Sequence, residues 1–119
     1  MTLVFVYGTL KRGGSNHGFL MGECFLGHAR TVPGYTLYTL DGYPGMVPDA
    51  SAEGVLGELW SVDAKCLAAL DDLEGVSENL YRRAPIQLEA PFATVAAETY
   101  LYARPIAGRP HLGPTWPVQ

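Results

Sequence analysis

The chain has 119 residues, of which 48% are hydrophobic and 17% charged, so it is long enough and apolar enough to bury one core. This balance excludes an intrinsically disordered chain. Eight Lys and Arg residues against twelve Asp and Glu residues leave a formal net charge of −4. Because the cations stand alone or in the pairs Lys11-Arg12 and Arg82-Arg83, no nucleic-acid partner is expected.

Compartment and metal content can also be judged from residue types. No stretch approaches the roughly 18 apolar residues of a membrane span, and the first residues lack a basic leader, so we expect a cytoplasmic protein with no membrane partner. Cys24 and Cys66 are then expected to be two buried, reduced thiols. His17, His28 and His111 show no metal-ligand spacing, so no metal site is expected.

Short strands separated by glycine and proline turns are predicted along one domain, residues 1–119. The apolar run 3–7, rich in β-branched and aromatic residues, is typical of a buried strand that ends at Gly8. A loop over 11–18 leads into a helical turn near 17–21. Further strands are predicted over 24–32, 35–40, 55–62, 81–89 and 94–103.

One segment, 63–74, has clear helical character, with Asp63 as N-cap and Gly75 just beyond its end. The tail 104–119 holds four prolines and two glycines and is expected to lack regular structure or to fray. Many short strands with one main helix favour an α+β chain, either a small mixed barrel or a strongly curved sheet with a helix packed on it.

The predicted helix places a carboxylate near its apolar face. At roughly 100° per residue the leucine stripe is centred on Leu70, and Glu74 lies about 40° from that centre. Asp71 is marginal, and Asp72 points to solvent. A buried carboxyl group has a raised pKa and can take and return protons, as a general acid/base must. The alternative is that the helix frays and Glu74 turns into water.

The second candidate for chemistry is the glycine-containing loop 7–14 at the end of the first strand. Gly8 allows backbone N–H groups to turn outward and form a concavity for a carboxylate or an oxyanion. A nucleotide phosphate loop is excluded, because Gly14 stands where that motif requires Lys. A simple tight turn that ends an inner strand remains the structural alternative.

Taken together, these motifs resemble the gamma-glutamylcyclotransferase-like family. The matching pieces span residues 3 to about 103 in the family's order: FVYGTLKRG (5–13) with Asn16, YPGMVP (43–48), VLGELW (55–60), LDDLEG (70–75), YRR (81–83) and YLY (100–102). The resemblance implies a compact six-stranded β-barrel with flanking helices. It also implies an amide-cleaving, cyclising enzyme of the gamma-glutamylamine type, needing neither metal nor organic cofactor.

In that reaction the α-amine of a small γ-glutamyl substrate attacks its own γ-carbonyl, giving 5-oxoproline and a free amine. By resemblance Glu74 is the general acid/base, and the substrate-binding residues are Tyr7, Gly8, Thr9, Leu10, Tyr81 and Tyr102. A monomer or a weak homodimer is expected. Two alternatives stay open: an enzyme acting on another γ-glutamyl or aminoacyl substrate, and a non-catalytic protein that binds such ligands in the same pocket.

Overall fold

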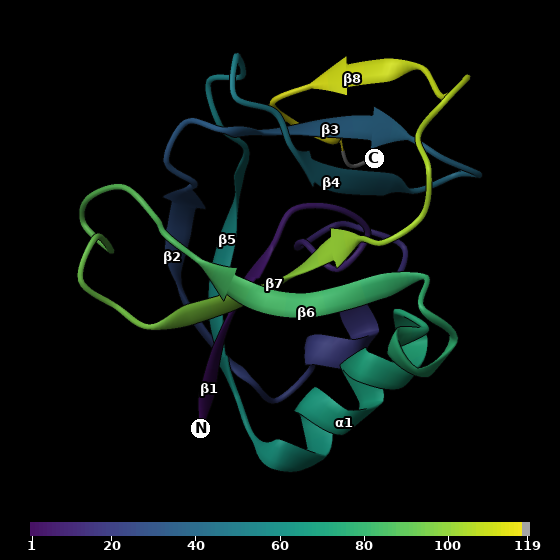
Figure 1. Cartoon of the computed structure of the whole chain (residues 1–119). Helices are drawn as coiled ribbons and strands as arrows, with labels where there is room; N and C mark the ends of the chain where they lie inside the picture. The colour runs from purple at the N-terminus through teal and green to yellow at the C-terminus, as the bar shows by residue number, and fades with distance from the viewer. Residues whose placement is uncertain (118–119) are drawn as a thin grey trace.

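The computed structural model describes residues 1–117 and contains two β-sheets, one α-helix and two short 3-10 turns (Figure 1). Strands β2-β5-β1-β7-β6 form a five-stranded sheet, and β4-β3-β8 form a three-stranded sheet. The elements in chain order are β1 Thr2–Val6, η1 His17–Leu20, β2 Cys24–Arg30, β3 Tyr35–Thr39, β4 Pro44–Pro48, β5 Leu56–Val62, α1 Ala64–Leu73, η2 Val76–Glu78, β6 Tyr81–Ile86, β7 Ala97–Tyr102 and β8 His111–Gly113.

The α+β class is confirmed, but the expected closed six-stranded barrel is wrong. The strands are divided between two open sheets, because β6 and β4, at their respective edges, share no ladder of backbone hydrogen bonds. The two edge strands of the large sheet, β2 and β6, are connected by one isolated β-bridge, between Thr31 and Leu88, in the described segments that follow them. The large sheet therefore curls without closing.

Strand β1 lies at the centre of the molecule and divides the core in two. It pairs antiparallel with β5 and parallel with β7. Because successive side chains point to opposite faces of a strand, Val4 and Val6 pack in the cluster that contains Leu70 of α1, whereas Phe5 packs in the cluster of the small sheet. Helix α1 and the small sheet thus cover different parts of one five-stranded sheet (Figure 1).

Helix α1 begins and ends where the sequence predicts. The Asp63 carboxylate accepts a hydrogen bond of 2.7 Å from the backbone N–H of Cys66, as an N-cap does. Gly75 has φ +63°, the left-handed conformation that ends many helices. The last turn is closed by a 2.9 Å hydrogen bond from the Glu74 N–H to the Leu70 carbonyl, so the helix does not fray before residue 74.

Two strands lie where the sequence indicates only turns or an irregular tail. Strand β4 contains the Pro44-Gly45 pair but is buried and pairs along its whole length with β3. Proline is tolerated there because it is the first residue of an edge strand. Strand β8 lies in the tail and pairs with β3, so residues 111–113 are regular, against expectation, while residues 118–119 of that tail lie outside the described part.

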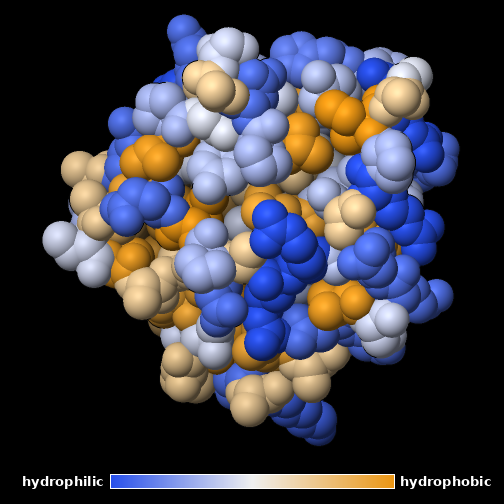
Figure 2. All heavy atoms as spheres, viewed as in Figure 1, coloured by the Kyte–Doolittle hydropathy of each residue, from blue (hydrophilic) through white to orange (hydrophobic). Residues whose placement is uncertain are grey.

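The face seen in Figure 2 mixes hydrophilic and hydrophobic side chains over β6 and α1. Cys24 and Cys66 are both free thiols, but neither is buried as expected: Cys24 is exposed and Cys66 is half-buried. No helix within residues 1–117 has the length and apolar character needed to cross a bilayer.

Candidate active site

A cavity of about 300 Å³ opens where the end of β1, the end of α1 and the start of β4 meet. Its wall brings together segments that are distant in sequence but adjacent across the two sheets. The side chains and backbone around it come from Phe5, Val6, Tyr7, Gly8, Thr9, Leu10, Ser15, Asn16, Gly42, Tyr43, Pro44, Leu73, Glu74, Leu80, Tyr81 and Tyr100. Six of the seven residues that the sequence proposed for the site are in this set; Tyr102 is not.

Glu74 provides the single ionisable carboxyl group of this cavity wall. It follows the last residue of α1 with helical backbone angles, which direct its side chain along the helix face that packs inward. Within residues 1–117 its carboxylate forms no hydrogen bond or ion pair with another protein group. Burial without a partner disfavours the charged form and raises the pKa of Glu74 to about 7. At neutral pH this group exchanges a proton readily.

The loop after β1 lines the same cavity. Its shape is held by hydrogen bonds from Lys11 N–H to the Gly8 carbonyl (3.1 Å) and from Asn16 N–H to the Thr9 carbonyl (2.9 Å). The N–H groups of Gly8, Thr9 and Leu10 donate no hydrogen bond to any other described residue. Adjacent N–H groups without protein acceptors can bind a negatively charged oxygen, as the sequence suggests for this loop.

Two cavity tyrosines use their hydroxyl groups to join the sheets. The Tyr7 hydroxyl donates to the Tyr100 carbonyl on β7 (2.6 Å) and accepts from the Met46 N–H on β4 (3.2 Å). The Tyr81 hydroxyl donates to the Pro44 carbonyl at 2.6 Å. Burial is the main cause of the raised pKa of both phenols, and it keeps them neutral. Their rings line the cavity while their hydroxyls hold its walls together.

Tyr100 and Tyr102 have different surroundings in the structure, although both lie on β7 two residues apart. Tyr102 packs edge-on against the Tyr81 ring, 5.5 Å between centroids, and is not part of the cavity wall. Tyr100 lines the cavity, and its hydroxyl donates to the Asp71 carboxylate of α1 at 2.7 Å. Arg83 on β6 forms an ion pair with the other oxygen of Asp71, so the end of α1 is held against β6 and β7.

Several cavity residues were missed by sequence reasoning as site residues. Tyr43, Leu73 and Leu80 belong to turns or to a helix end, where residue type alone does not indicate which cavity they face. Asn16 appeared only as part of the family resemblance; its side-chain amide donates to the Thr9 hydroxyl at 3.0 Å and supports the loop. No cluster of three metal-ligating side chains occurs among residues 1–117.

The comparisons of this chain with known proteins indicate the same family. Residues 4–117 match the family model described as gamma-glutamyl cyclotransferase, AIG2-like. A protein of Vibrio cholerae named "Putative gamma-glutamylcyclotransferase" is 48% identical over 100 residues, which cover 84% of this chain and 81% of that protein. The gamma-glutamylaminecyclotransferase of Homo sapiens is 34% identical over 122 residues, covering 87% and 79%.

The fold has close counterparts among solved structures. The crystal structure of an AIG2-like protein from Mus musculus superposes with a TM-score of 0.81 at 29% identity. The match covers 94% of this chain and 86% of the mouse protein.

Proposed function

This chain belongs to the gamma-glutamyl cyclotransferase, AIG2-like family of enzymes, and on that premise we propose that it releases 5-oxoproline from a γ-glutamyl amine. The substrate's α-amino nitrogen attacks the γ-carbonyl carbon and closes a five-membered lactam. The bond from that carbon to the leaving nitrogen breaks. The α-ammonium nitrogen loses two protons as it becomes the lactam N–H, and the leaving nitrogen gains two and departs as an ammonium ion, so the reaction consumes no water and no external reagent.

The observation that carries this proposal is the unpaired, largely buried carboxyl group of Glu74 with a pKa of about 7. Such a group accepts the proton from the α-ammonium group and returns it to the departing nitrogen with little energetic cost in either direction. Because nucleophile and carbonyl are in one molecule, the protein's main tasks are to hold them in contact and to move the proton.

The free N–H groups of the loop after β1 supply the second requirement. Negative charge develops on the carbonyl oxygen as the ring closes, and donors already oriented toward that oxygen stabilise it without reorganisation. Gly8, Thr9 and Glu74 all line this cavity. In this mechanism the acid/base and the oxyanion donors act from two sides of one substrate.

The charge of the cavity favours an amine as the leaving group. Its described wall contains the carboxyl group of Glu74 and no Lys, Arg or His side chain. A γ-glutamyl amino acid or glutathione brings an additional carboxylate, for which this wall offers no cationic partner, and burying an uncompensated charge is costly. The human relative named gamma-glutamylaminecyclotransferase supports the same substrate class.

The test is an assay of 5-oxoproline release from γ-glutamyl amines, γ-glutamyl amino acids and glutathione. We expect turnover of the amines, loss of turnover in Glu74→Gln, and ordinary turnover in the matched control Glu78→Gln, whose side chain is exposed nearby. Full activity of Glu74→Gln contradicts the mechanism. Saturable binding of every substrate without product contradicts catalysis and favours a ligand-binding protein.

A further inference from the structure

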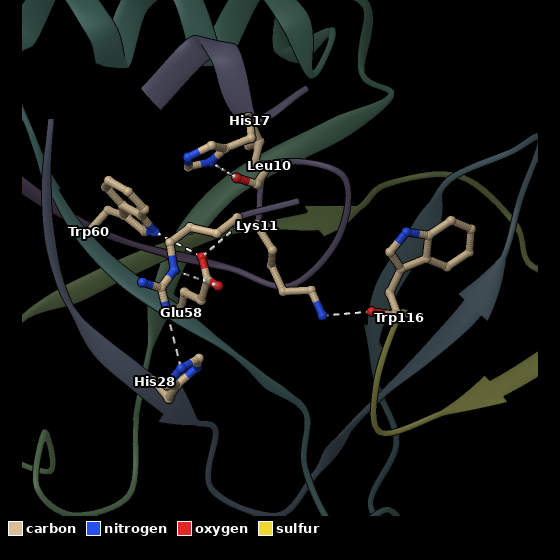
Figure 3. A network of polar contacts seen from close by, with 8 residues as sticks. Leu10, Lys11, His17, His28, Glu58, Trp60 and Trp116 are labelled. Atoms are coloured by element: carbon tan, nitrogen blue, oxygen red, sulfur yellow. Dashed lines mark hydrogen bonds and ion pairs between the residues drawn. The ribbon is translucent and has the colours of Figure 1, made fainter. Parts of the chain in front are cut away.

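A second polar network lies under the loop that borders the cavity, and its centre is Glu58 of β5 (Figure 3). Glu58 is only 5% exposed, although it is a charged residue type. Its Oε1 atom accepts hydrogen bonds from the backbone N–H of Arg12 and from the Trp60 indole, each 3.1 Å long. Its Oε2 atom faces the Arg12 guanidinium at 3.6 Å.

Arg12 is therefore held by one carboxylate through both its backbone and its side chain. Its guanidinium lies over the Phe25 ring, 3.8 Å from the centroid, and contacts His28 Nε2 at 3.2 Å. These contacts leave the side chain little freedom to turn away from β2 and β5. Figure 3 shows Glu58 with Trp60 and His28 close by in this network.

Arg12 is connected to the cavity wall through the backbone of the loop. The preceding residue, Lys11, donates its N–H to the Gly8 carbonyl and its ammonium group to the Trp116 carbonyl at 2.6 Å. The loop is thus tied to β5 through Arg12 and to the C-terminal segment through Lys11. Between Gly8 and these anchors lie the N–H groups of Thr9 and Leu10.

Burial of Glu58 gives this arrangement its rigidity. A loop that swings away from β5 removes two of the donors that contact the carboxylate, and it leaves a buried charge without its cation. The free energy of the open loop is raised by that loss. We propose that Glu58 is a positioning residue for the reaction, which holds the Gly8–Leu10 N–H groups in the geometry that the developing oxyanion requires. Only the kinetic part of this inference rests on the proposed function.

The experiment compares Glu58→Gln with wild-type protein. The amide keeps the size of the side chain and one acceptor oxygen, but it loses the ion pair and one of the two acceptor sites. We expect kcat/KM for a γ-glutamyl amine to fall roughly 10- to 100-fold, at a temperature well below the melting point of both proteins. The amide protons of Lys11, Arg12 and Asn16 should exchange faster, with exchange in β7 unchanged.

Glu89→Gln is the matched control, because Glu89 forms an ion pair with Arg30 that is half-exposed and lies outside this network. It should leave both kinetics and loop exchange as in the wild type. Arg12→Ala and the Arg12→Ala/Glu58→Gln double variant complete a cycle. If the two residues act through one contact, the double variant loses less activity than the product of the single losses.

Each outcome decides the inference. If the loop amides of Glu58→Gln are as well protected from exchange as those of the wild type, and kcat/KM stays within twofold, the inference is overturned. It is also overturned if the activity losses of the two single variants simply multiply in the double variant. If Glu58→Gln lowers the melting temperature while loop exchange stays unchanged, Glu58 stabilises the fold alone and the inference is wrong. If wild-type protein releases no 5-oxoproline, the proposed function fails, yet the exchange measurement still tests whether Glu58 holds the loop.

Discussion

The Tyr81 hydroxyl on β6 donates a 2.6 Å hydrogen bond to the Pro44 carbonyl on β4, and so joins an edge of the large sheet to an edge of the small one. Both residues line the cavity. The bond replaces the backbone ladder that a closed barrel would have at this position. Together with the Tyr7 hydroxyl, which bridges β7 and β4, this bond holds two walls of the candidate active site together.

Replacing Tyr81 by Phe removes this hydrogen bond and leaves a buried carbonyl without its donor. We expect the free energy of unfolding to fall by about 1–2 kcal/mol, because an unsatisfied buried acceptor costs that much. Urea unfolding measures it. Tyr35→Phe is the control, since the Tyr35 hydroxyl has no hydrogen bond among the described residues, and its change should stay within about 0.5 kcal/mol. Equal losses in the two variants contradict the role of the bond.

The rate of 5-oxoproline release should depend on the ionisation of Glu74. As a general base Glu74 must first be deprotonated, and its pKa is about 7. We therefore expect kcat/KM at pH 6 to be about tenfold lower than at pH 8, with the midpoint of the rise near neutrality. A profile that is flat between pH 5 and pH 8 would exclude Glu74 as the base.

The same raised pKa makes Glu74 unfavourable for folding when it is charged. Its pKa is about 7 in the folded protein against 4.5 ordinarily, so the folded state holds the proton more tightly. The resulting stabilisation is complete below pH 4.5 and is lost as the pH rises to about 7, a change of about 3 kcal/mol. Glu74→Gln cannot undergo this loss.

Unfolding of both proteins at several pH values tests this sign. The stability of Glu74→Gln relative to wild type should increase from pH 4 to pH 8 by about 3 kcal/mol and then level off. The comparison cancels the titration of groups that the two proteins share. A relative stability that is independent of pH would show that the carboxyl group is not buried in solution.

The contact of Asp71 with Tyr100 and Arg83 should matter for catalysis through the placement of α1. Asp71→Asn weakens the ion pair and the 2.7 Å hydrogen bond, and we expect a loss of about 1 kcal/mol in stability with a severalfold fall in kcat. The adjacent Asp72 is exposed, so Asp72→Asn serves as the control. Equal kinetics for the two variants would show that this contact does not position Glu74.

A methyl group at Gly8 should disturb the loop where backbone and proline approach closely. An added Cβ would lie 2.6 Å from Pro44 Cγ, too close without a shift of the loop or of β4. We expect Gly8→Ala to lower kcat/KM at least tenfold, because the N–H donors move with the loop. Gly18→Ala meets no atom within 4 Å and is the control. A normal rate for Gly8→Ala would contradict a catalytic role of this backbone.

The parts that sequence predicted well are those with a local signal. The apolar run of β1, the leucine spacing of α1 and its caps at Asp63 and Gly75 each depend on residues within one element. The position of Glu74 relative to Leu70 follows from the helix period in the same way. Such short-range patterns are readable without knowing the rest of the chain.

Strand β4 and the small sheet could not be read in this way. Pro44-Gly45 has the composition of a turn, and β8 lies in a proline-rich tail, so only their pairing with β3 makes them strands. Glu58 likewise stands in an ordinary strand pattern, and its link to Arg12 joins residues 46 positions apart. Tyr102 and Tyr100 share a strand face, yet only Tyr100 reaches the cavity.

The sequence by itself thus determined the helix, the central strand and the glycine loop that follows it, and it placed Glu74 near the apolar face of the helix, because periodicity and capping act over a few residues. The tertiary structure decided that the strands form two open sheets joined by tyrosine hydroxyls. It also decided that Glu74 and the loop N–H groups border one cavity, and that Glu58 lies beneath that loop. These relationships depend on the packing of distant segments, which no local pattern encodes.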